Sequence, residues 1–207
     1  MSCLRIILLP LPSRFIHDNG SAGIFFEGET GSESSIQIEG VRSINNGYGM
    51  YFNVLDEAIL NLRVKDSETS YNKGGGFYIY STGSIDFEVE GFFNSRYNGF
   101  DGMAFFNSLP FEGEMKVKGV VNLYKNSWRG FYMDGAVNVV VDKGGALNSC
   151  SNDQGGYIFE SLDIYNDGSR TFSGDGYTCG TEGNSGTGGP PGANLPVCEA
   201  CPSCPSE

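Results

Sequence analysis

The sequence has few basic residues and no long apolar run. Lysine and arginine total 13 against 25 aspartate and glutamate residues, for a formal net charge of −12. Nucleic acid needs a basic patch facing its phosphates, and the sequence offers none, so this partner is not expected. The apolar run near the N-terminus is broken by Pro10 and Pro12 and is too short for a transmembrane helix.

Histidine is almost absent, whereas glycine is abundant. The single histidine, His17, lies in the stretch FIHDNG, where we expect an exposed loop residue rather than a catalytic base. Glycine accounts for 31 of 207 residues, about twice its usual share. A backbone with so much glycine turns often or approaches itself closely, which favours many short strands over long helices.

One pattern recurs along most of the chain: an asparagine, three other residues, a glycine and an apolar triplet. Successive asparagines are separated by 26, 27, 26, 28 and 26 residues. The pairs are Asn19-Gly23, Asn45-Gly49, Asn72-Gly76, Asn98-Gly102, Asn126-Gly130 and Asn152-Gly156. A fixed period of this size predicts a solenoid, in which each repeat buries its core against its neighbours.

Within a repeat the apolar residues alternate with a period of two, as in SIDFEVEG, which is typical of strands. A further short signature follows in three repeats as GFFN, GVVN and GALN. Two or three strands per coil predict an all-β parallel β-helix of about six coils. We expect its asparagines to occupy left-handed corners and to stack as a hydrogen-bonded ladder.

Aligning the coils on the second strand of each repeat places charges in register. One outward row reads Glu39, Lys65, Glu90, Lys118 and Asp142, and a neighbouring row reads Gln37, Arg63, Glu88, Lys116 and Val140. Strands about 4.8 Å apart bring opposite charges of such a row together, which is favourable. We therefore interpret these rows as a structural charge ladder rather than as a catalytic acid cluster.

The asparagine–glycine corner followed by alternating strands resembles the right-handed parallel β-helix repeat of the pectin-lyase-like superfamily, over about residues 15–166. The resemblance implies a possible activity on polysaccharides, as a lyase, a galacturonan hydrolase or a uronate epimerase. The N-T-D, D-D and G-H-G signatures of the hydrolases do not occur. Because fold does not determine function, each activity has to be judged at its site.

A lyase of this superfamily needs acidic calcium ligands beside a basic residue that removes a proton. Asp101, Arg129 and Asp134 are the residues near the corners that could serve, with calcium as the cofactor. We expect these side chains to be solvated corner residues, and we expect a non-catalytic protein without a cofactor. A fragment of a polysaccharide lyase, whose site lies partly upstream, is the alternative.

The two ends differ from the repeats in composition. Residues 1–14 are interpreted as a remnant coil or a truncated N-terminal segment, so we expect the chain to be the C-terminal part of a larger protein. Residues 167–207 are rich in glycine, serine, proline and cysteine and are acidic, which predicts a flexible, solvated tail.

Six cysteines raise a choice between metal binding and disulfides. Cys198, Cys201 and Cys204 form C-x-x-C-x-x-C, and a fourth zinc or iron–sulfur ligand would have to be Cys179, Cys150 or Cys3. We favour disulfides among Cys150, Cys179 and the three tail cysteines. This interpretation predicts an extracellular or cell-surface protein.

One outward column of the predicted helix is rich in aromatic residues. The residues two positions after each corner glycine are Phe25, Tyr51, Tyr78, Ala104, Tyr132 and Ile158. We interpret Phe25, Tyr51, Tyr78 and Tyr132 as a stripe that binds a polysaccharide or a surface protein. Packing between coils, in a protein that is a structural spacer, is the alternative.

Overall fold

The computed structural model describes residues 3–8, 14–107, 113–134, 137–150, 152, 157–160, 172–173 and 177–180. The described residues form strands and turns without a helix, and so none of them belongs to a helix that could cross a bilayer. The expected all-β class is confirmed. The tail cysteines Cys198, Cys201 and Cys204 lie outside the described residues, as do the side chains of the other three cysteines.

Each complete coil has three limbs. The first limb consists of β1 (Cys3–Leu8), β4 (Glu33–Glu39), β11 (Gly113–Val117), β14 (Val137–Val141) and β17 (Phe172–Ser173), and the second of β2 (Arg14–His17), β5 (Val41–Ile44), β12 (Val120–Tyr124), β15 (Ala146–Cys150) and β18 (Tyr177–Gly180). Two long strands, β7 (Ile59–Ser70) and β9 (Ser84–Arg96), run through both limbs. The third limb consists of β3 (Ala22–Gly28), β6 (Tyr48–Val54), β8 (Phe77–Ser81), β10 (Met103–Asn107), β13 (Phe131–Asp134) and β16 (Tyr157–Glu160).

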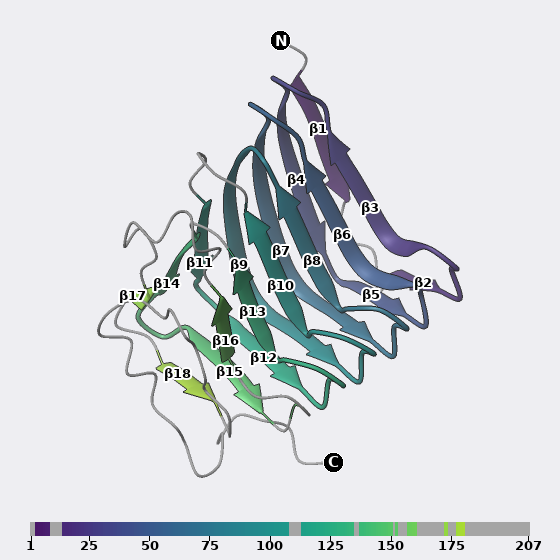
Figure 1. The fold of residues 1–207 in the computed structure, drawn as a ribbon, viewed down its shortest axis with the longest axis vertical. Helices are drawn as coiled ribbons and strands as arrows, with labels where there is room; N and C mark the ends of the chain where they lie inside the picture. The colour runs from purple at the N-terminus through teal and green to yellow at the C-terminus, as the bar shows by residue number, and fades with distance from the viewer. Residues whose placement is uncertain are drawn as a thin grey trace.

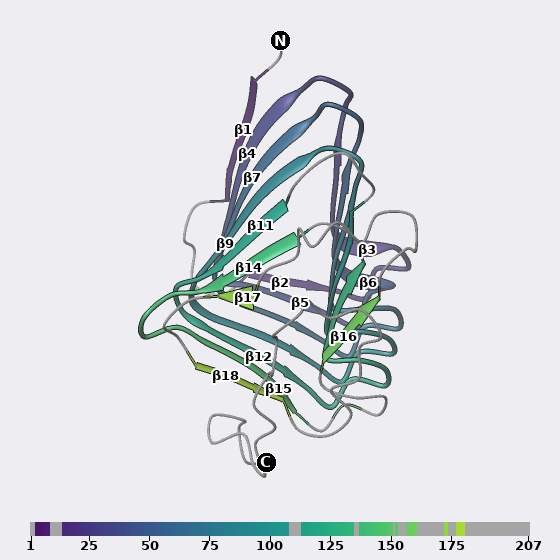
Figure 2. The same ribbon diagram turned by 60° about the vertical axis from the view of Figure 1, so that its left-hand side comes forward.

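The limbs stack into two parallel sheets. A 12-stranded sheet contains the first and second limbs, and a 6-stranded sheet in the order β16-β13-β10-β8-β6-β3 contains the third. Figure 1 shows the coils following one another along the molecule, and Figure 2 shows the limbs as the sides of the stack. The expected parallel solenoid is confirmed, with about five turns. Part of the expected tail joins it, since β17 and β18 pair with β14 and β15.

The register predicted from the charge rows is the register of the structure. Glu39 lies beside Lys65, which lies beside Glu90, and the Lys65 ammonium is 2.7 Å from the Glu39 carboxylate. In the neighbouring row Arg63 and Glu88 are paired at 3.2 Å. These side chains are partly buried at the surface and still reach solvent. Each pair therefore contributes little stability and serves mainly to favour the correct register.

The core lies between the limbs and is filled by phenylalanine rings. Phe77 in β8 packs with its ring centroid 5.3 Å from that of Phe52, 5.0 Å from that of Phe87 and 5.5 Å from that of Phe93. All four side chains are fully buried. Inward residues of the third limb therefore meet inward residues of the other limbs, and the residues between them face outward.

The expected asparagine ladder is confirmed at the corner between the second and third limbs. The backbone N–H of Asn72 donates to Oδ1 of Asn98 at 3.1 Å, and that of Asn98 donates to Oδ1 of Asn126 at 3.1 Å. The ladder residues are Asn19, Asn46, Asn72, Asn98, Asn126 and Asn152, with N–H to Oδ1 distances of 2.9–3.1 Å. In the second coil the ladder residue is Asn46, so the alignment that used Asn45 was wrong by one residue.

The prediction that the ladder asparagines are left-handed was also wrong. At these corners the positive φ values, between 54° and 58°, belong to the residues immediately before the ladder asparagines: Asp18, Asn45, Tyr71, Tyr97 and Lys125. The left-handed residue makes the turn and directs its own side chain outward. The following asparagine can then reach its neighbour inside the corner, where four of the ladder residues are almost completely buried: Asn46, Asn72, Asn98 and Asn126.

The repeated asparagine of GFFN, GVVN and GALN forms a second row of hydrogen bonds in the second limb. Nδ2 of Asn122 donates to Oδ1 of Asn94 at 2.9 Å, and Nδ2 of Asn148 donates to Oδ1 of Asn122 at 2.9 Å. Side-chain amides can bond along a stack in this way because identical residues sit in register on neighbouring strands. In these three coils the sequence thus uses asparagine twice for the same purpose.

The corner glycines are required because the ladder occupies the space that a side chain would need. A Cβ atom at Gly102 would lie 2.6 Å from Nδ2 of Asn126 and 2.8 Å from the carbonyl oxygen of Gly130. Both atoms belong to the corner of the next coil. Glycine is therefore needed here for close approach between coils.

We predict that Gly102→Ala lowers the free energy of unfolding by about 1–3 kcal/mol, because the added methyl group forces the ladder apart. Urea denaturation measures this change. Gly20→Ala is the matched control, since a Cβ atom at Gly20 meets no atom within 4 Å. Equal stability of the two variants would contradict the steric role assigned to Gly102.

Candidate functional site

The outward side of the third-limb sheet carries two columns of side chains. The column predicted from the sequence is in register, with Phe25 beside Tyr51, Tyr51 beside Tyr78, and Ala104 between Tyr78 and Tyr132. A second column, two residues further along each strand, reads Glu27, Asn53, Tyr80, Phe106 and Asp134. We name the side chains Phe25, Tyr48, Tyr51, Tyr78, Tyr80 and Phe106 the aromatic face.

The two ends of the predicted stripe differ in their solvent exposure. Phe25 is 59% exposed, whereas Ala104 is fully buried and Tyr132 is only 5% exposed. Tyr51 and Tyr78 are partly buried. The surface available to a ligand therefore lies over the earlier coils, where β3, β6 and β8 stand side by side (Figure 1).

The rings of the aromatic face contact one another. Tyr51 is nearly parallel to Phe25, with 5.9 Å between centroids, and nearly parallel to Tyr78, with 6.5 Å between centroids. Tyr48 meets Tyr51 and Tyr78 edge-on, at 5.6 Å and 5.2 Å. The face is thus one continuous surface, and its rings hold each other in place.

Tyr48 is a member of this face that the column rule did not identify. It lies at the start of β6, two residues after the ladder asparagine of its coil, and is 36% exposed. A Cβ atom at Gly74 of the next coil would lie 2.9 Å from the Tyr48 ring, so the ring covers that glycine. The signal in the sequence is an aromatic residue between two corner glycines, Gly47 and Gly49.

The second column adds aromatic rings and polar groups. Tyr80 is 42% exposed and contacts Phe106, whose ring also packs against Tyr78 at 5.8 Å. Beside them, Nδ2 of Asn53 donates to a carboxylate oxygen of Glu27 at 2.9 Å. Hydrogen-bonding groups therefore border the apolar rings on the same side of the third-limb sheet.

Two of the three catalytic candidates meet beneath the end of this face, and they form an ion pair. Nε of Arg129 lies 2.5 Å from Oδ1 of Asp101, and Nη2 lies 3.0 Å from Oδ2. Asp101 is fully buried and Arg129 is 8% exposed. A bidentate arginine–carboxylate contact of this kind is among the strongest that arginine makes. Asp101, which was expected to be solvated, is instead enclosed in this pair.

Aromatic rings surround the guanidinium group of Arg129. Its Cζ atom lies 3.5 Å from the ring centroid of Tyr132 and 4.5 Å from that of Trp128. Burial opposes the charged form, but the hydrogen bonds and charge of Asp101 outweigh it and hold the pKa of Arg129 above its usual value. Tyr132, the fourth predicted stripe residue, therefore packs against an ion pair and has little exposed surface.

Tyr78 connects the ion pair to the aromatic face. Its hydroxyl donates to Oδ2 of Asp101 at 2.7 Å. Burial, together with the charge of Asp101 and this hydrogen bond, raises the pKa of Tyr78 far above its usual value. The hydroxyl stays protonated, which fixes the ring at the centre of the face.

Asp134 and His17, the other two residues considered for catalysis, are not part of this ion pair. Asp134 is partly buried at the end of β13, in register with Phe106. His17 is exposed at the end of β2, with Nδ1 2.8 Å from a carboxylate oxygen of Asp18. Among the described residues, no three acidic, histidine or cysteine side chains are close enough together to hold a metal ion.

We predict that Arg129→Met lowers the free energy of unfolding by about 3–5 kcal/mol, because it leaves the Asp101 carboxylate buried without a counter-charge. The double variant Asp101→Asn with Arg129→Met removes both charges and should recover a large part of this loss. Urea denaturation of the three proteins measures the effect. An Arg129→Met protein as stable as the parent would contradict the assigned pair.

We predict that Tyr78→Phe is less stable than the parent by about 1.5–3 kcal/mol at neutral pH, the value of a hydrogen bond to a charged group. The folded pKa of Tyr78 lies above the unfolded value of about 10. This stabilisation is therefore complete below pH 10 and declines as the pH rises further. Urea denaturation between pH 7 and pH 11 tests this, and a constant difference over that range would contradict it.

Comparisons of this chain with protein-family models, with curated proteins and with solved structures find no match. A parallel solenoid with an asparagine ladder is compatible with many functions. The aromatic face and the residues that support it are therefore the features that bear on function.

Proposed function

We propose that the protein is a non-catalytic module that binds a polysaccharide through the aromatic face. The observation that carries the proposal is the continuous row of contacting rings on the third-limb sheet, of which Phe25, Tyr48 and Tyr80 are exposed and the others partly buried. Contiguous apolar patches of this kind usually mark a binding surface. Tyrosine suits a wet binding surface because its ring is apolar while its hydroxyl stays hydrated.

The chemistry of the face fits a sugar chain better than a second protein. The C–H groups on one side of a sugar ring pack against an aromatic ring, and its hydroxyl groups project sideways toward polar neighbours. Glu27 and Asn53 lie beside the rings. The Glu27 carboxylate accepts hydrogen bonds, and the Asn53 amide both donates and accepts them. Because the coils repeat about every 4.8 Å, such contacts recur along the length of a bound polysaccharide.

The support beneath the face favours binding without a change of shape. Tyr78 is tied to Asp101, and Asp101 is tied to Arg129 in the corner of the following coil. A surface that is ordered before the ligand arrives loses less conformational entropy on binding. The same contacts occupy the two groups that a lyase mechanism would require, since Asp101 has no exposed surface and Arg129 has very little.

Two finer assignments belong to this proposal. The first is membership of the pectin-lyase-like superfamily, which the three-limbed parallel coil and the asparagine corner support. The second is an extracellular or cell-surface location, where a module for structural polysaccharides meets its ligand. The cysteine-rich segment at the C-terminus, with disulfides as its expected chemistry, supports this location.

We predict that the triple variant Phe25→Thr, Tyr51→Thr, Tyr80→Thr binds polysaccharide at least about tenfold more weakly than the parent. A tenfold loss corresponds to about 1.4 kcal/mol of binding free energy, which the loss of one good contact would already cause. Threonine keeps the strand propensity of these positions, and Tyr78 is left in place because it is tied to the ion pair. Affinity electrophoresis in gels containing polygalacturonate, alginate, xylan or hydroxyethyl cellulose measures the binding.

The matched control is Phe15→Thr with Phe92→Thr, which removes two exposed rings from the second limb, outside the aromatic face. These side chains are 55% and 42% exposed. Circular dichroism and the urea midpoint establish that all proteins are folded. The proposal is wrong if no gel retards the parent, or if the triple variant is retarded as strongly as the control.

A further inference from the structure

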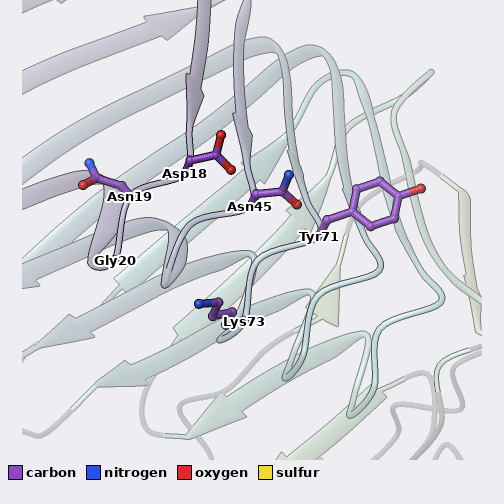
Figure 3. Close-up of a pocket in the computed structure, with 6 residues that line it drawn as sticks. All are labelled: Asp18, Asn19, Gly20, Asn45, Tyr71 and Lys73. Carbon is purple, nitrogen blue, oxygen red and sulfur yellow. The ribbon is translucent and has the colours of Figure 1, made fainter.

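A second aromatic site lies around the corner from the aromatic face, on the outer side of the asparagine ladder. A hollow of about 340 Å³ is lined there by Asp18, Asn19, Gly20, Asn45, Tyr71 and Lys73. Figure 3 shows Asp18, Asn45 and Tyr71 following one another along one rim, with Gly20 and Lys73 on the turns of the opposite rim. We name this hollow the corner site.

Tyr71 is the first member of a stack that runs along the coils. Its ring is parallel to that of Tyr97 within 4°, with 4.9 Å between centroids. On the far side of Tyr97, the ammonium group of Lys125 lies 5.5 Å from the ring centroid. One end of the stack is therefore occupied by a cation, and the other end is the Tyr71 ring beside the hollow.

The side chains that continue this row past Tyr71 are short. Asn45 takes the equivalent position in the preceding coil, because Ile44 is in register with Ser70, and Asp18 takes it in the coil before that. Neither side chain is large enough to cover a phenol ring. The row of left-handed residues thus changes from rings to small polar groups at the hollow, and Tyr71 is 52% exposed there.

The backbone at Tyr71 makes this exposure more informative. Its φ is 56°, a left-handed conformation that asparagine and aspartate adopt readily and a bulky aromatic residue does not. Asn45 and Asp18 occupy the equivalent turns without this cost. The Tyr71 ring packs against Tyr97 and is still half exposed, and backbone strain of this kind concentrates at functional positions.

We propose that the corner site binds one sugar ring, which stacks on the open side of Tyr71 and extends the Tyr71–Tyr97 stack by one member. Asp18 and Asn45 lie along the edge of that ring and accept hydrogen bonds from its hydroxyl groups, and Lys73 donates to it from the opposite rim. The choice of ligand class rests on the proposed function, whereas the position of the site rests on the hollow and the stack.

Tyr71→Asn tests the site because it removes the ring and relieves the left-handed strain at once. If the ring serves the ligand, the variant unfolds at the same urea concentration as the parent or at a higher one, and its retardation by polysaccharide weakens by about tenfold, the size of one stacking contact on an aromatic ring. Tyr71→Phe keeps the ring and should bind like the parent. The probes are the four polysaccharide gels used for the aromatic face.

The outcomes separate this inference from the proposed function. Unchanged binding by Tyr71→Asn, with binding lost by the Phe25, Tyr51 and Tyr80 triple variant, overturns the corner site and leaves the aromatic face in place. Binding lost by Tyr71→Asn alone supports the corner site and overturns the face. A lower urea midpoint for Tyr71→Asn assigns the ring to packing and overturns the corner site, and a parent that no gel retards overturns both.

Discussion

The hydrogen bond from each corner amide to the asparagine side chain of the next coil is the constraint on which the rest of the structure depends. A buried N–H group without a partner is costly, so every coil must present an asparagine oxygen at the same place. This requirement fixes the corner, and the corner fixes the start of the next strand. Asn72, Asn98 and Asn126 show it most fully, since each is buried and bonded to its neighbours on both sides.

A ladder that fixes the corners also fixes which residues lie side by side on the outer surface. Coils in strict register turn a repeated position in the sequence into a column, so a repeated residue type becomes a surface of one kind. The Glu39, Lys65 and Glu90 column becomes a row of opposite charges, and the Phe25, Tyr51 and Tyr78 column becomes a row of rings. Inward positions and corners maintain the solenoid, which leaves the outward positions available for binding.

The repeat made most of the fold predictable, because period, strand alternation and register are all local properties of the sequence. The predicted stripe was correct in register but not in its exposure. Tyr132 is buried because Arg129 lies over its ring and is held there by Asp101, one coil earlier. Contacts of this kind depend on three-dimensional packing at the corner and leave no periodic signal. Tyr48 was missed for a different reason: it lies at the start of β6, one residue before the corner glycine Gly49, and the column rule covers only residues after that glycine.

The left-handed turn explains why function can gather at the corner as well as on the sheet. The ladder needs only the backbone of the residue before each asparagine, so its side chain points outward and is free to vary. Asp18 and Asn45 are the residues that this backbone prefers, and Tyr71 and Tyr97 are not. The two tyrosines stack on each other and so recover part of the cost. Tyr71 remains half exposed beside the hollow, and the sugar ring proposed there stacks on the side of Tyr71 opposite Tyr97 and adds a further contact.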